Sequence, residues 1–219
     1  MLGLFTEDSL MRLILTLPGL LFAITFHEFA HAFAADKLGD DTPRRQGRLT
    51  LNPLAHLDPV GSILLLFAGF GWGKPVQVNP RKFKGTMSCG EAIVSIAGPL
   101  MNFFLAIIFL IAYYMLLRFG TGLEGNVYIV IASMLFYGGA INIGLGVFNL
   151  IPLPPLDGSK ILMHFLPYNA RQWFIENEKI FYMAFIIMFV TGISSYIISP
   201  IISGIFSTLL KFIGMFFGV

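Results

Sequence analysis

Long apolar stretches alternate with short polar ones along this chain. Five stretches are apolar enough to form membrane helices, at about residues 8–35, 91–117, 127–149, 180–198 and 201–217. A helix of about 20 apolar residues crosses a bilayer. The last two stretches meet at Ser199-Pro200, where we expect the chain to turn. The pattern predicts an all-α polytopic membrane protein with about five spanning helices.

Two shorter patterns lie between the first and second of these helices. The apolar run 62–71 is too short to span a bilayer, so we expect a re-entrant or interfacial segment there. After it, Val76, Gln77, Val78 and Asn79 alternate apolar and polar side chains. Such alternation is typical of a short strand, and it predicts a membrane-associated β-strand or hairpin.

The composition supports a membrane protein without a second domain. Hydrophobic residues make up 56% of the chain and charged residues 12%, whereas soluble domains have about 45–50% and about 25%. The single cysteine, Cys89, excludes an internal disulfide and a cysteine-rich metal site. The net charge of +2 gives no reason to expect nucleic-acid binding. We expect one domain over residues 1–219.

The positions of lysine and arginine predict how the chain crosses the membrane. Positive residues favour cytoplasmic loops. The side opposite the two long loops holds only Arg12 and Arg118. The loops themselves hold Lys37, Arg44, Arg45, Arg48, Lys74, Arg81, Lys82, Lys84, Lys160, Arg171 and Lys179. We therefore expect a multi-pass protein of the cell membrane, with its N-terminus outside and both long loops in the cytoplasm.

The first apolar stretch contains the sequence HEFAH at residues 27–31. His27 and His31 are four residues apart, so on a helix they share one face and can bind one metal ion. Glu28 beside them can take a proton from water, which is the H-E-x-x-H pattern of zinc hydrolases. An ionisable group near the bilayer centre costs about 2.5–3.5 kcal/mol, so chance placement of three of them is disfavoured. We predict a metal site.

A catalytic zinc usually has a third protein ligand. The candidates are His56, Asp58, Asp157 and His164. Glu28 lies about 10 Å inside the cytoplasmic end of its helix, at 1.5 Å per residue. Asp157 follows a proline-rich break after the third apolar stretch, which places it at a similar depth. We favour Asp157 as the ligand and keep His56 as a candidate to support the site from outside the ligand set.

Two motifs in this order resemble the site-2 protease family of intramembrane zinc metalloproteases. HEFAH is the first, and NLIPLPPLDG at residues 149–158 fits the family pattern N-x-x-P-x-P-x-L-D-G throughout. AGPLMNF at residues 97–103 is similar to a third family stretch, Gly-Pro-x-x-Asn. The similarity covers roughly residues 10–165 and is closest to small prokaryotic members without PDZ or CBS domains.

The resemblance implies a specific set of roles. His27, His31 and Asp157 would hold one Zn²⁺, and Glu28 would be the general base. Asn149 would hydrogen-bond the substrate or the developing oxyanion. The substrate would be a transmembrane helix of another membrane protein. The catalytic core would cover about residues 10–165, followed by a helical hairpin over about 180–217.

Physical reasoning adds a hypothesis about the substrate. A helix hides its carbonyl groups in its own hydrogen bonds, so it must unwind before hydrolysis. The predicted strand offers an edge to which unwound substrate could add, at Val76 and Val78. Asn102 and Asn142 either project into the cavity or bond one helix to another.

Three alternatives share the metal-binding residues. A divalent-metal transporter needs the same ligands, but we find no inverted repeat of the kind that many transporters carry. A catalytically inactive scaffold does not need intact H-E-x-x-H and L-D-G motifs. A membrane zinc peptidase that cuts soluble or juxtamembrane peptides differs only in its substrate.

Overall fold

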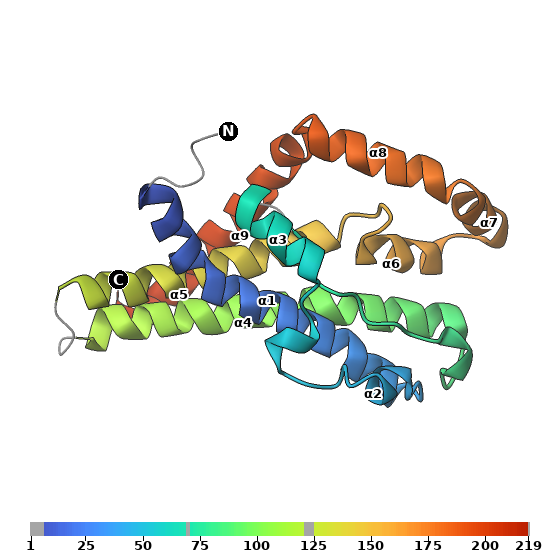
Figure 1. The fold of residues 1–219 in the computed structure, drawn as a ribbon, viewed down its shortest axis with the longest axis horizontal. Coiled ribbons are helices and arrows are strands. Elements are labelled where there is room, and N and C mark those ends of the chain that lie inside the picture. The colour runs from blue at the N-terminus through green and yellow to red at the C-terminus, as the bar shows by residue number, and fades with distance from the viewer. Residues whose placement is uncertain (1–6, 69–70, 121–124, 219) are drawn as a thin grey trace.

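The computed structural model describes residues 7–68, 71–120 and 125–218. Over these residues the chain is helical, with extended or turn-rich connections (Figure 1). The α-helices are α1 Glu7–Lys37, α2 Thr42–Arg45, α3 Pro59–Ala68, α4 Met87–Phe119, α5 Asn126–Asn149, α6 Asp157–Phe165, α7 Tyr168–Glu176, α8 Glu178–Val190 and α9 Ile193–Phe217. Two single 3-10 turns are η2 Pro53–Ala55 and η3 Pro80–Lys82.

The three long helices α1, α4 and α5 pack against one another and form the central bundle (Figure 1). Helix α9 lies against α4 and α5, and the short helix α6 lies against α4. Helices α1, α4 and α5 cover the first three predicted stretches, so that part of the prediction is confirmed. The bundle brings His27 and His31 in the second half of α1 next to Asn102 and Val94 in the first half of α4.

Within the described residues, four helices are long and apolar enough to cross a membrane. They are Met11–Lys37 of α1, then α4, α5 and α9. The predicted number of about five is not supported. Helix α8 has 13 residues, or about 20 Å, against a hydrocarbon core of about 30 Å.

The predicted turn at Ser199-Pro200 is wrong, because Pro200 lies inside α9. The break comes earlier, at Gly192, whose φ of 75° is in the left-handed region. A glycine in this conformation ends a helix by turning its N–H back to the last carbonyls, and here Gly192 N–H donates to Phe189 O at 3.2 Å. An internal proline removes only one helical hydrogen bond, which membrane helices tolerate.

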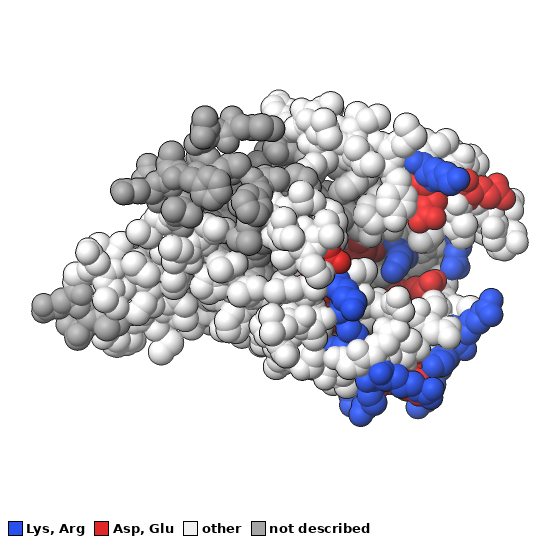
Figure 2. Space-filling model, in the orientation of Figure 1, with Lys and Arg blue, Asp and Glu red and all other residues white. Residues whose placement is uncertain are grey.

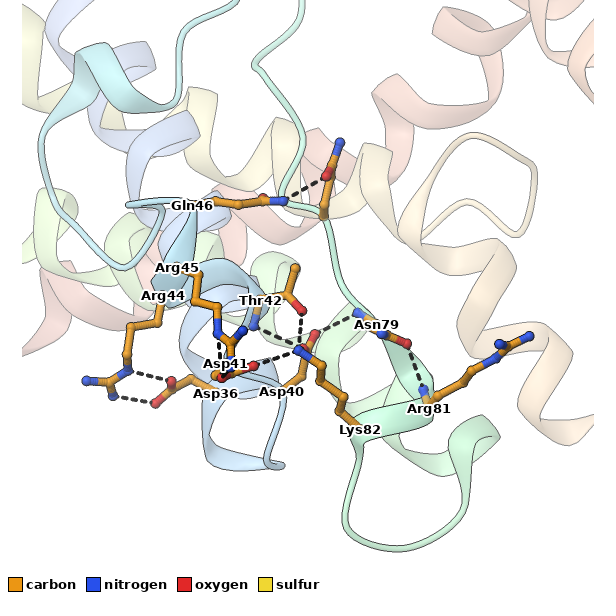
Figure 3. Close-up of polar contacts among 11 residues, drawn as sticks. Asp36, Asp40, Asp41, Thr42, Arg44, Arg45, Gln46, Asn79, Arg81 and Lys82 are labelled. Carbon is orange, nitrogen blue, oxygen red and sulfur yellow. Dashed lines mark hydrogen bonds and ion pairs between the residues drawn. The ribbon is translucent and has the colours of Figure 1, made fainter.

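The predicted strand at residues 76–79 is also wrong. The segment is extended but forms no regular strand, and the described residues contain one isolated β-bridge, between Leu57 and Gly73. Its backbone groups bind side chains of α1 and of the loop after it. Val76 N–H donates to Glu28 Oε2 at 2.9 Å, and Asn79 N–H donates to Asp40 Oδ2 at 2.6 Å (Figure 3). The alternation in this segment matches its burial, because Val76 and Val78 are partly buried and Gln77 between them is exposed.

The apolar run 62–71 coincides in part with α3, which is 10 residues long. Residues 69–70 of that run lie outside the described residues. A helix of this length cannot span a bilayer, as predicted, and its re-entrant position stays a prediction.

Charged side chains gather at one end of the face shown in Figure 2, on α2, on α7 and on the segment that leads into η3. Among the residues not drawn in grey, the opposite end of that face shows almost no charged side chains. Where α2 meets η3 these charges are paired: Arg44 binds Asp36 at 2.7 Å, and Lys82 binds Asp41 at 2.6 Å (Figure 3). This end of the molecule is the one that the lysine and arginine positions assign to the cytoplasm.

Candidate metal centre

Two histidines of α1 and one aspartate of α6 meet at a single point. Asp157 Oδ2 lies 3.2 Å from His27 Nε2 and 3.1 Å from His31 Nε2. The two Nε2 atoms are 2.9 Å apart. Both histidines are buried and Asp157 is nearly so. They form the one group of potential metal ligands found among the described residues.

These three distances match a tetrahedral metal site. Zinc ligands lie about 2.0–2.1 Å from the ion, which places neighbouring tetrahedral ligands about 3.3 Å apart. The observed separations of 2.9 to 3.2 Å are close to this value. Three protein ligands of a tetrahedron leave its fourth position free for water or substrate, as in catalytic zinc sites.

The hydrogen bonds behind the histidines fix which nitrogen carries the proton. His31 Nδ1 lies 2.7 Å from Val94 O, and His27 Nδ1 lies 2.6 Å from Asn102 Oδ1. Both partners are acceptors, so each Nδ1 donates and each Nε2 presents a lone pair to the centre. Asn102 is oriented in turn, because its amide N–H groups donate to Ala23 O and Asn142 Oδ1, both at 3.1 Å.

The centre is therefore electron-rich on all three sides. Two neutral imidazole lone pairs face a carboxylate oxygen that has no hydrogen-bond donor of its own. Buried polar atoms almost always have a partner, and these atoms repel one another unless a cation lies between them. The donor set of two nitrogens and one carboxylate oxygen suits zinc.

Two glycines that the sequence reasoning did not single out allow these ligands to converge. A Cβ at Gly98 of α4 would lie 2.5 Å from His31 Nε2 and 2.6 Å from His27 Cε1. A Cβ at Gly158 would lie 2.3 Å from Leu150 O, at the turn that leads from α5 to Asp157. Gly98 belongs to the motif AGPLMNF and Gly158 to the motif NLIPLPPLDG. Membership of these motifs was the sequence signal by which both glycines could have been found. Asp157 begins α6, so the compact turn before it sets its position.

Glu28 follows His27 on α1 and lies beside the 73–76 segment. Its Oε2 accepts the Val76 N–H at 2.9 Å and lies 3.9 Å from Arg48 Nη2. The structure thus joins two of our candidate residues, Glu28 and Val76, through the Val76 backbone. Arg48 was counted only as a loop charge in the sequence, and it is buried here with 4% of its surface exposed.

The asparagines lie at different depths around the centre. Asn102 and Asn142 are fully buried and bond α4 to α5, which matches the interhelical alternative. Asn142 also donates to Gly138 O at 2.9 Å. Asn149 ends α5 and donates to Leu145 O of the same helix at 3.1 Å, so its proposed contact with substrate stays a prediction.

The other candidate ligands lie outside the metal group. His56 is fully buried and its Nε2 donates to Thr50 O at 2.8 Å. Burial lowers the pKa of His56 below its ordinary value, and nearby Arg48 lowers it further. Asp58 accepts the Gly61 N–H at 2.8 Å, and His164 lies 3.2 Å from Ser88 Oγ. Val78 packs against the small core of Ala35, Phe83 and Val94.

Replacing Asn102 with leucine is expected to lower zinc affinity about 10- to 100-fold, the usual effect of losing a group that orients a histidine ligand. The His27 ring would lose the acceptor that holds its Nδ1 proton. Competition with a fluorescent zinc chelator measures the affinity. Asn177→Leu is the matched control, because among the described residues the Asn177 side chain donates to Trp173 O, in the turn between α7 and α8 and away from the histidines. Equal affinity for the Asn102 variant and the wild type would contradict the role of Asn102.

Comparison with known proteins is consistent with this centre. Residues 123–192 match the model of peptidase family M50. The chain is 42% identical over 206 residues to “Putative zinc metalloprotease YwhC” of Bacillus subtilis, covering 90% of each chain. It is 30% identical over 207 residues to “Putative zinc metalloprotease Rip2” of Mycolicibacterium smegmatis, covering 85% of this chain and 77% of the relative.

A more distant relative is archaeal. “Zinc metalloprotease MJ0392” of Methanocaldococcus jannaschii is 26% identical over 158 residues, which is 72% of this chain and 35% of the relative. No solved structure is significantly similar to the chain.

Proposed function

The chain belongs to peptidase family M50, and we propose that it is an intramembrane zinc metalloprotease that hydrolyses peptide bonds within or near transmembrane helices of other membrane proteins. The observation that carries this function is the meeting of His27, His31 and Asp157 beside Glu28. It occurs among helices long and apolar enough to cross a bilayer, where ionisable groups are costly unless they have a role.

We propose a role for each residue of the site. His27, His31 and Asp157 would hold the zinc, which would supply Lewis acidity at the scissile carbonyl. Glu28 takes a proton from the attacking water and then passes it to the leaving amine. We propose that Asn149 hydrogen-bonds the substrate, since it ends α5 at the turn that leads to Asp157.

We also propose the orientation and the division of the chain. The lysine and arginine residues around α2 and η3 support a cytoplasmic location for the metal-bearing end and an N-terminus outside. Within one domain, we propose a catalytic core over about residues 10–165 and a C-terminal helical hairpin over about 180–217.

The function is tested by metal removal from the protein purified in detergent. Dialysis against 1,10-phenanthroline is expected to abolish cleavage of single-span helical substrates, because the ligands alone do not activate water. Adding back one equivalent of zinc should restore the rate. The readout is gel-resolved product formation with zinc measured per chain.

A soluble peptide tested in parallel separates this function from that of a peptidase that acts outside the membrane. Zinc uptake into liposomes separates it from a transporter. Cleavage that persists in zinc-free protein would overturn the proposal. Uptake of zinc without cleavage of any substrate would favour the transporter.

We propose that unwound substrate lies along residues 75–79. The segment is extended, it is not part of a sheet among the described residues, and Gln77 is exposed. Val78→Pro removes one backbone N–H that could bind the substrate. Losing one hydrogen bond of about 1.4 kcal/mol corresponds to about a tenfold slower cleavage, which is the expected result. Val78→Leu is the control, since it keeps the N–H. Equal rates for the proline variant and the wild type would remove this segment from the substrate site.

A further inference from the structure

Arg48 is a buried arginine in the loop between α2 and η2, next to the proposed base. Its Nη1 donates to Ala55 O and its Nη2 to Lys74 O, so one guanidinium joins two segments that are 19 residues apart. The planar fork of arginine suits two acceptors in fixed positions, whereas the ammonium group of lysine acts as a point charge. The side chain is only 5% exposed.

The charge of Arg48 faces the base. Within the described residues, Glu28 is the one carboxylate within 4 Å of this guanidinium, with Nη2 3.9 Å from Oε2. Arg44 and Arg45 differ, because both are largely exposed and each pairs with an aspartate, Asp36 at the end of α1 and Asp41 just before α2. Exposed pairs contribute little, while a buried charge is costly unless it is paired.

The segment that Arg48 holds also carries a hydrogen bond to Glu28. Lys74 accepts from Arg48 through its carbonyl and donates its own N–H to His56 O at 2.8 Å. Two residues later, the Val76 N–H reaches Glu28 Oε2 at 2.9 Å. The bond from Arg48 thus anchors the backbone at Lys74, and two residues later the same backbone binds Glu28 through the Val76 N–H.

The far end of the same segment is fixed independently. Asn79 N–H donates to the buried Asp40 at 2.6 Å, and Lys82 binds Asp41 at 2.6 Å (Figure 3). Lys84 N–H donates to Leu38 O at 2.7 Å. With this end anchored to the end of α1, the path of residues 74–76 depends on the anchor at Lys74.

We propose that Arg48 is a positioning residue for the reaction: it holds residues 74–76 so that the Val76 N–H and its own charge fix one oxygen of Glu28 and leave the other free to take the proton. This inference rests on the proposed function, in which Glu28 is the base. Arg48 itself touches no metal ligand in the contacts described.

The test compares Arg48→Met and Arg48→Lys with the wild type in detergent, using the same single-span helical substrate. We expect Arg48→Met to lower kcat about 100-fold, the scale of a misplaced reacting group, with KM and zinc content unchanged. Arg48→Lys keeps the charge without the fork and is expected to recover part of kcat. Arg45→Met is the matched control and should behave as the wild type.

A double-mutant cycle separates positioning from general stability. Val76→Pro removes the N–H that reaches Glu28 and leaves Arg48 in place. If Arg48 acts through this contact, adding Arg48→Met to the Val76→Pro variant should lower kcat much less than Arg48→Met lowers it in the wild type. Multiplying effects would mean that Arg48 acts elsewhere, and would overturn the proposal.

Other results also overturn it while leaving the proposed function intact. One is a kcat of Arg48→Met within threefold of an active wild type. Another is a loss of activity in both Arg48 variants that follows a loss of zinc or of thermal stability, which would make Arg48 merely structural. If Arg48→Met fails to fold, Arg48→Lys decides by the same readouts. These outcomes differ from a failure of the proposed protease function, because in that case the zinc-loaded wild type would cleave none of the substrates.

Discussion

Glu28→Gln is expected to abolish cleavage and leave the zinc site intact. Glutamine has the same size, and its amide oxygen can still accept the Val76 N–H that Glu28 accepts at 2.9 Å. It cannot take a proton from water, and loss of a general base slows a reaction about 10²- to 10⁴-fold. The ligands His27, His31 and Asp157 are untouched, so one zinc per chain should remain.

The experiment measures zinc per chain by atomic emission and the initial rate of cleavage of single-span helical substrates. Glu91→Gln is the matched control, because Glu91 lies on α4, pairs with Arg171 at 3.4 Å and is outside the metal group. A Glu28→Gln protein that cleaves within tenfold of the wild-type rate would show that another group is the base. Loss of zinc in this variant would instead place Glu28 among the ligands.

Gly98→Ala is expected to remove zinc and activity together. The added Cβ would lie 2.5 Å from His31 Nε2 and 2.6 Å from His27 Cε1, closer than real Cβ contacts come. Either α4 moves away from α1 or both rings turn, and each change breaks the convergence on Asp157. Loss of a group that supports a metal ligand usually lowers metal affinity about 10- to 100-fold. We expect Gly98→Ala to lower zinc affinity by at least this much.

Zinc per chain, the affinity in a chelator competition and the melting temperature together test this expectation. Gly144→Ala is the matched control, because its Cβ on α5 would meet only Ile202, at an ordinary 3.9 Å. It should keep zinc, activity and stability. A Gly98→Ala protein with full zinc and full activity would mean that α4 does not approach the histidines this closely.

Much of the candidate site was predictable because it rests on short-range regularities. The four-residue spacing of His27 and His31 places both on one face of any helix, whatever the fold around it. The order of HEFAH and NLIPLPPLDG then indicated Asp157, and the structure brings its carboxylate to both histidines. The long helices α1, α4 and α5 were predictable for a similar reason, since an apolar run of that length has few alternatives in a bilayer.

The predictions that were wrong depended on choices that a local pattern leaves open. Alternation at Val76 and Val78 indicates a half-buried extended chain, but a strand also needs a neighbour in register. Here Glu28 and Asp40 take the backbone N–H groups of Val76 and Asn79 instead. Likewise, Pro200 and Gly192 both permit a break, and the helix ended at the left-handed glycine.

The sequence by itself determined the long apolar helices α1, α4 and α5, the pair of histidines with their glutamate, and the metal that suits them, because each follows from spacing and composition within one segment. Only the tertiary structure decided which groups surround them. Gly98, Asn102 and Val94 face the histidines from another helix, and Arg48 meets Glu28 across a loop. These contacts join residues far apart in the chain, so they depend on how the helices pack rather than on any local pattern of residues.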